Sequence, residues 1–122
     1  MSYIDPTTRQ HVDAKEITLL AASSRTASEN SAWIDVGDAH TLRLDLTITA
    51  NSGTAETLDV TIQTRKDAND TARTLGTFTQ KTDGTDERKC FSGLDRQIRA
   101  VTTIGGSDTP TFAFSLSGEL VG

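Results

Sequence analysis

One cysteine, two prolines and 5% aromatic residues are the clearest shortages of this 122-residue chain. The single cysteine, Cys90, excludes an intramolecular disulfide and argues against a disulfide-stabilised secreted scaffold. With so few aromatics, the core must come from leucine, isoleucine, valine, alanine and four phenylalanines. The length suits one domain that can bury a core without covalent staples.

Positive charge is also scarce, since the chain has 12 Lys and Arg residues but 17 Asp and Glu residues, which gives a net charge of −5. An acidic chain gains nothing from counterion release on a nucleic-acid backbone, so we expect no nucleic-acid partner. No apolar run approaches the roughly 18 residues of a membrane span. Residues 1–6 lack the basic and apolar regions of a signal peptide, so we expect synthesis and solubility in the cytoplasm.

What the chain has in abundance is β-strand patterning, supported by 21 threonines. The plainest case is residues 41–49, where Leu42, Leu44, Leu46 and Ile48 alternate with polar residues. A period of two indicates a strand with one buried face. Threonine, being β-branched, suits the solvated face of such strands.

Turn signals separate about eight such strands at a spacing of roughly 8–12 residues, which is typical of an all-β sandwich or barrel. We expect strands at residues 16–22, 32–36, 41–50, 58–65, 73–80, 87–92, 97–104 and 111–121. Trp33 is expected to anchor the second strand, and Gly76 to mark a bulge in the fifth. The prediction is a single antiparallel β-sandwich over residues 16–122, jelly-roll-like, with an immunoglobulin-like strand order left open.

Residues 1–15 are polar, contain Pro6 and show no clear period. We interpret them as an extended N-terminal arm that docks on a neighbouring subunit, with terminal disorder as the alternative. The candidate partner-binding residues are Tyr3, Ile4, Arg9 and Lys15.

Threonines on the outward positions of several strands could form a ladder on a solvated sheet. The candidates are Thr47, Thr49, Thr61, Gln63 and Thr102 or Thr103. Ordinary exposed strand residues are the simpler interpretation, and a flat Thr-rich docking face is the alternative.

No catalytic constellation is recognisable, so we expect no enzyme. His11 and His40 lack the nucleophile and orienting acid that a triad requires, and Gly-x-Ser-x-Gly is absent. Cys90 is expected to be buried and inert. One cysteine with two distant histidines makes no zinc pattern.

We expect no metal and no cofactor. The acidic segments 67–70 and 83–87 lack the spaced oxygen ligands and terminal bidentate Glu of a calcium loop, and suit turns. Gly105 and Gly106 are not followed by the Lys and Ser or Thr of a phosphate loop. A sugar-stacking platform would need more aromatics than the core leaves over.

Several runs together resemble small virion proteins of tailed bacteriophages. They are the opening 17–27 (ITLLAASSRTA), the central 44–54 (LDLTITANSGT) and 58–63 (LDVTIQ), and the ending 110–118 (PTFAFSLSG). The resemblance covers most of the chain from residue 16 onward. It implies a capsid-associated β-sandwich without enzymatic activity that decorates or cements the head shell, often as a trimer.

The expected partners are therefore the major capsid protein and further copies of this chain, in a homotrimer on the virion surface. An extended arm or strand edge can bind by adding a strand to a neighbouring sheet, and lattice repetition multiplies modest affinities. Some proteins of similar size instead sit at the neck or tail as completion or adaptor proteins. A carbohydrate-binding module of a fibre is the alternative from another class. No site is carried over residue by residue.

Overall fold

The computed structural model describes the backbone of residues 2–4 and 11–121 and the side chains of residues 15–121. Its strands are β1 (Ser2–Ile4), β2 (His11–Arg25), β3 (Glu29–Asn30), β4 (Ile34–Asp35), β5 (Thr41–Arg65), β6 (Arg73–Thr77), β7 (Glu87–Ser92) and β8 (Gln97–Val121). In the described part of the chain no helix is long and apolar enough to cross a membrane. The predicted all-β class is confirmed.

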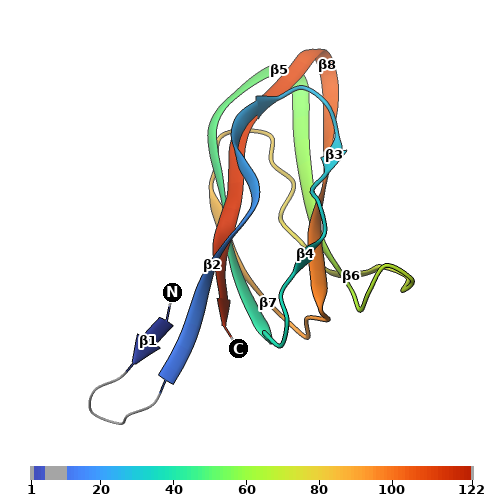
Figure 1. The fold of residues 1–122 in the computed structure, drawn as a ribbon. Helices are drawn as coiled ribbons and strands as arrows, with labels where there is room; N and C mark the ends of the chain where they lie inside the picture. Colours follow the sequence, from blue (N-terminus) through green and yellow to red (C-terminus); the bar gives the residue numbers. More distant parts are fainter. Residues whose placement is uncertain (1, 5–10, 122) are drawn as a thin grey trace.

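The two longest strands, β5 and β8, form one antiparallel ribbon that folds over on itself (Figure 1). Their pairing runs from Thr41 opposite Val121 to Arg65 opposite Gln97. Both strands bend at the same level, where Gly53 and Gly106 have φ angles of 125° and 121°, a region open mainly to glycine. The expected strands at 41–50 and 58–65 are therefore one continuous strand, β5, and those at 97–104 and 111–121 are one strand, β8. The bends carry turn residues, but the pairing of β5 with β8 continues beyond them.

Folding the ribbon over creates two layers. The first sheet, in the order β2, β8, β5 and β7, uses residues 111–121 of β8 and 41–52 of β5. The second sheet uses residues 97–105 of β8 and 57–65 of β5, with β3 and β4 on one side and β6 on the other. A ribbon wrapped into two antiparallel sheets is the jelly-roll arrangement, so the predicted jelly-roll-like sandwich is confirmed.

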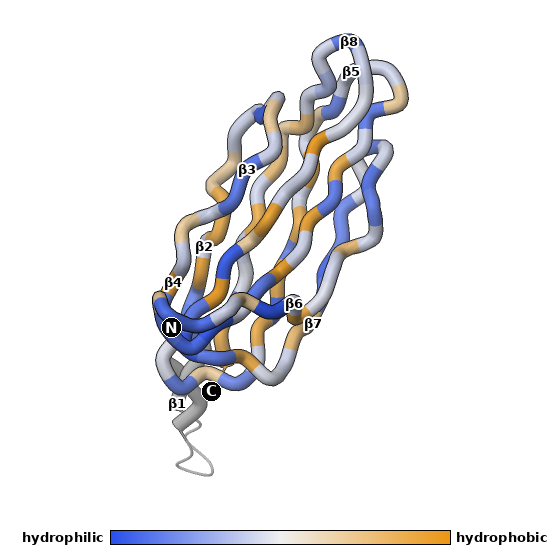
Figure 2. The backbone as a smooth tube through the Cα atoms, turned by 90° about the vertical axis from the view of Figure 1, so that its right-hand side faces the viewer, coloured by the Kyte–Doolittle hydropathy of each residue, from blue (hydrophilic) through white to orange (hydrophobic). Residues whose placement is uncertain are grey.

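The core lies between these sheets and follows the two-residue period (Figure 2). Along β5 the inward side chains are fully or almost fully buried on both halves, and the outward ones are polar. The buried ribbon residues are Leu42, Leu44, Leu46, Ile48, Leu58, Val60, Ile62, Ile98, Ala100, Phe112, Phe114, Leu116 and Leu120. Burial of these apolar side chains supplies the main favourable term in folding.

The predicted bulge lies in β6. Ile62 pairs with Gly76 but Gln63 pairs with Thr74, which leaves Leu75 as the extra residue. A β-carbon on Gly76 would lie 2.9 Å from a ring carbon of Phe91, so the core side of the bulge has room only for glycine. The bulge thereby brings β6 against β7 across the open edge of the sandwich.

Buried hydroxyls complete the backbone pairing where the edge of the second sheet is irregular. Ser31 Oγ accepts a 2.8 Å hydrogen bond from the Ala100 amide. Thr102 Oγ1 donates to the Glu29 carbonyl at 2.8 Å. Since buried backbone groups must find partners, these side chains allow β3 and β4 to be two residues long.

The start of the chain forms a hairpin that projects from the sandwich (Figure 1). Residues 2–4 of β1 pair with residues 11–13 of β2. Pairing of β2 with β8 begins at Ala14 opposite Val121 and Lys15 opposite Leu120. A docking role for the arm at 1–15 stays a prediction.

Candidate functional site

The outer face of the first sheet carries a cluster of charged side chains where β5, β7 and β8 lie next to each other. Arg88 Nε donates to Asp45 Oδ1 at 2.6 Å, and these residues are directly opposite in the β5–β7 register. Arg43 lies 3.5 Å from Glu119, its partner in the β5–β8 register. The hydrogen bond to Asp45 raises the pKa of Arg88. Opposite charges in register stabilise this face while leaving it solvated.

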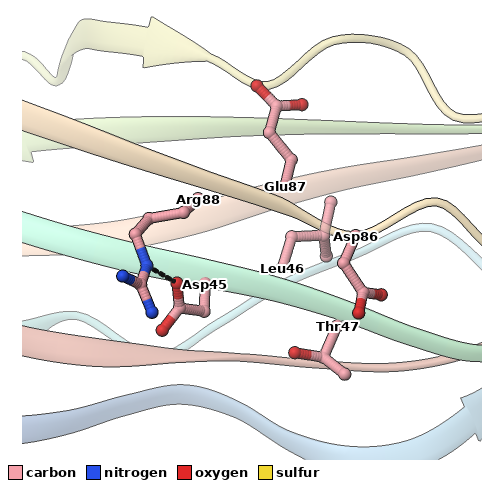
Figure 3. A pocket seen from close by; sticks show the side chains of 6 residues that line it. All are labelled: Asp45, Leu46, Thr47, Asp86, Glu87 and Arg88. Carbon is pink, nitrogen blue, oxygen red and sulfur yellow. Dashed lines mark hydrogen bonds and ion pairs between the residues drawn. The ribbon is translucent and has the colours of Figure 1, made fainter.

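A depression of about 380 Å³ includes Asp45 and Arg88 of this cluster, and Figure 3 shows the side chains around it. It is lined by Asp45, Leu46, Thr47, Asp86, Glu87 and Arg88. Asp86 Oδ1 accepts a 2.8 Å hydrogen bond from the Ile48 amide and so extends the β5–β7 ladder past its last backbone pair. The depression therefore holds carboxylates that already have partners.

A second depression, of about 320 Å³, opens on the same face and shares Asp45 with the first. Its lining includes Glu16 from β2, Arg43 from β5, and Ser117 and Glu119 from β8. Both hollows are lined mainly by polar and charged side chains.

Cys90 is exposed, so the expectation of a buried cysteine is wrong. The reason is the alternation along β7. Phe91 takes the inward position and packs in the core, and its neighbour in the strand must then point outward. Cys90 lies opposite Arg43 in the register, on the charged face.

Trp33 also differs from expectation, because it is half-buried outside the core rather than an anchor within it. The next residue, Ile34, packs against the core and pairs with Ile98. The ring of Trp33 instead meets two guanidinium groups. The carbon at the centre of the Arg65 guanidinium lies 4.1 Å from the ring centroid, and that of Arg99 4.6 Å.

A part-buried ion pair joins the loop between β6 and β7 to the first residue of β7. Lys81 is 6% exposed, and its Nζ lies 2.8 Å from Glu87 Oε1. The Thr79 amide donates to the same oxygen at 3.0 Å. Burial acts to raise the pKa of Glu87, but the hydrogen bonds from Lys81 and Thr79 outweigh it and hold that pKa below 4.5. This pair stabilises the connection between the sheets.

The two acidic segments are built as turns. Asp67 Oδ1 accepts from the Asn69 amide, and Asp83 Oδ1 accepts from both the amide and the hydroxyl of Thr85. These bonds lower the pKa of Asp83, whose side chain is fully exposed. Within the part of the chain that the structure describes, no group of three or more His, Cys, Asp or Glu side chains could hold a metal ion.

Of the two histidines and the predicted partner-binding residues, the structure describes the side chains of His40 and Lys15. His40 is exposed just before β5 and lines a depression of about 390 Å³ with Lys66, Asp95 and Arg96, among others. Lys15 is exposed at the base of the projecting hairpin. The backbones of Tyr3 and Ile4 lie in β1. Arg9 and the side chains of Tyr3, Ile4 and His11 lie outside the described residues.

The threonines are divided between the faces. Thr61 and Thr77 share a hydrogen bond of 3.2 Å between their hydroxyls across β5 and β6. Thr103 is exposed, whereas Thr102 is 2% exposed and belongs to the interior. Thr61 therefore has its threonine partner on β6. Alternation along the sequence does not show which strands are neighbours, so this partner was not predicted.

Comparison with known proteins gives a likeness in structure only. No family model matches the chain, and no curated protein matches it. A chain in the structure of infectious bursal disease virus, Gx strain, is similar with a TM-score of 0.51 and 16% identity. The likeness covers 98% of this chain and 35% of that chain, so this chain spans about a third of its neighbour's length. A likeness at this identity concerns the fold alone, so the expected β-sandwich is confirmed and a tailed-phage class stays a prediction.

Proposed function

We propose that this chain is a decoration or cement protein of a tailed-phage head. It binds the major capsid protein at the surface of the shell and associates with copies of itself about a three-fold axis. The observation that carries the proposal is the wrapped-ribbon sandwich, which a chain of a virus structure matches over 98% of this chain.

Two further features support a role in binding rather than in chemistry. The hairpin of β1 and β2 projects from the sandwich and offers backbone groups for strand addition. The depressions on the first sheet are lined mainly by polar and charged side chains, among them the ion pairs Arg88–Asp45 and Arg43–Glu119. Both features suit many weak contacts repeated on a lattice.

The experiment that tests this proposal is the copy number of the chain in purified particles, measured by quantitative mass spectrometry against the major capsid protein. We expect a ratio near one per capsid subunit, or a simple lattice fraction of it. A dozen or fewer copies per particle would overturn decoration and favour a neck or tail adaptor. Absence from particles would overturn any virion role and favour tests of sugar binding.

A further inference from the structure

Trp33, Arg65 and Arg99 form a cluster on the outer face of the second sheet, away from the charged face described above. Arg65 and Arg99 occupy outward positions on β5 and β8. Trp33 reaches this face from the segment between β3 and β4. Both guanidiniums lie within 5 Å of the Trp33 ring centroid, in the range of a cation–π contact.

The two guanidiniums are also held in place by amide side chains. Arg65 Nε donates to Gln97 Oε1 at 2.7 Å, and Arg99 Nε donates to Gln63 Oε1 at 2.9 Å. Each bond joins residues directly opposite in the register. Within residues 15–121 these two arginines donate through Nε alone, so toward this part of the chain the terminal nitrogens stay available as forked donors in a fixed position.

Within residues 15–121, neither Arg65 nor Arg99 has a carboxylate partner. The other arginines of this part of the chain that are half-buried or ion-paired each have one. In a chain with five more acidic than basic residues, the missing partner needs a reason. Asp35, opposite Gln97 in the register, instead accepts from the Gly37 amide. The arginines with carboxylate partners are Arg25, Arg43, Arg73 and Arg88.

We propose that this cluster, the Trp33 site, binds a carboxylate group of an Asp or Glu side chain on a partner protein. A guanidinium fork matches a carboxylate in geometry and charge, and Trp and Arg are the residues that most often dominate protein interfaces. The surface is a sheet face, and none of the three depressions described above includes these residues. A net charge of −5 opposes polyanions but not a single carboxylate in a protein surface.

Trp33 is the only tryptophan of the chain, so its fluorescence reports directly on the site. The probe is N-acetylglutamate α-amide, whose single charge is the side-chain carboxylate, and the control is N-acetylglutamine α-amide at the same ionic strength. We expect a saturable change in Trp33 emission with the acid and none with the amide. The double variant Arg65→Gln/Arg99→Gln should weaken binding by about tenfold or more, whereas Arg96→Gln, an exposed arginine, should not.

The outcomes separate the possible ligands. No saturable response to the acid, or an equal response in the double variant, would overturn the Trp33 site. Saturation by glucuronate or sialic acid at much lower concentration than by the glutamate probe would overturn a protein partner and favour an acidic sugar. Circular dichroism of the double variant checks that the sandwich is retained.

The identity of the partner as the major capsid protein rests on the proposed function and is tested apart from carboxylate binding. Retention of the double variant on purified shells is compared with that of Arg96→Gln. If the fluorescence response is found but shells retain both variants equally, the Trp33 site stands and its assignment to the shell is wrong. If shells retain neither variant nor the unchanged chain, the proposed function fails.

Discussion

At the scale of single residues, a few polar side chains donate hydrogen bonds to backbone groups where the strand pairing is irregular. Arg25 shows this on the edge of the first sheet. Its terminal nitrogens donate to the carbonyls of Phe114 at 2.7 Å and Ala21 at 2.6 Å, and its Nε donates to Glu29 at 2.5 Å. The guanidinium lies 4.5 Å from the ring of Phe114. One side chain thus supplies hydrogen-bond donors to backbone carbonyls near the irregular part of β2, where the register of β2 with β8 shifts.

The ion pair of Lys81 and Glu87 should make stability depend on pH. Because the pKa of Glu87 is lowered in the folded chain, its stabilising effect is fully present above about pH 4.5 and is lost as the pH falls through the folded value. Glu87→Gln should cost about 2–4 kcal/mol at pH 7, since it leaves the buried Lys81 charge without its partner. Urea unfolding at pH 7 and pH 3.5 measures this. Equal losses on acidification in both proteins would contradict it.

Gly118 should tolerate no side chain. A β-carbon at this position would lie 1.8 Å from the carbonyl oxygen of Arg43, so the backbones of β5 and β8 would have to separate. We expect Gly118→Ala to destabilise the fold by about 3 kcal/mol or more, measured as a shift of the thermal midpoint. Gly84→Ala, where the nearest atom lies at 3.8 Å, is the matched control and should change little.

At the scale of elements, alternation predicted which residues face the core but not how far the strands extend. The inward positions at Leu58, Val60 and Ile62 are confirmed. The segments around Gly53 and Gly106 carry turn residues, yet the strands bend there and continue. Whether a turn signal ends a strand depends on its partner bending at the same level, and that is a non-local property.

The same limit explains the errors at the candidate sites. Cys90 and Phe91 are adjacent in β7, so only one of them can face the core. Phe91 takes that position, and Cys90 is exposed. Trp33 looked like a core residue because it is large. Its place outside depends on Arg65 and Arg99, which are more than 30 residues away in the sequence. Strand pairing brings these residues together, and a single sequence gives no register.

The end of β5 should depend on one buried hydroxyl. Thr64 is fully buried, donates to the Gln97 carbonyl at 2.9 Å and accepts from the Asp95 amide at 2.9 Å. Thr64→Val keeps the shape but leaves both backbone groups without this partner, which should cost about 1–3 kcal/mol. Thr61→Val, on the outer face, is the control and should change the unfolding free energy much less. Equal effects would show that the hydroxyl of Thr64 contributes nothing special.

At the scale of the whole molecule, the sandwich and the projecting hairpin should be separable. Every core residue whose burial the structure describes lies after residue 16, and pairing of β2 with β8 begins at Ala14. Residues 11–13 pair with β1. Removing residues 1–13 should therefore move the thermal midpoint by no more than about 2 °C, because all the buried core residues that the structure describes are kept.

The same deletion should reduce binding to purified shells by about tenfold or more, because strand addition by the hairpin would lose its backbone donors and acceptors. Co-sedimentation with shells at matched protein concentrations measures this loss. Arg96→Gln, an exposed change on the sandwich, is the control and should sediment as the unchanged chain does. If the shortened chain binds shells normally, the hairpin is not the contact, and the outer sheet faces with the Trp33 site must carry the binding instead. A shortened chain that fails to fold would contradict the separation of hairpin and sandwich on which this test depends.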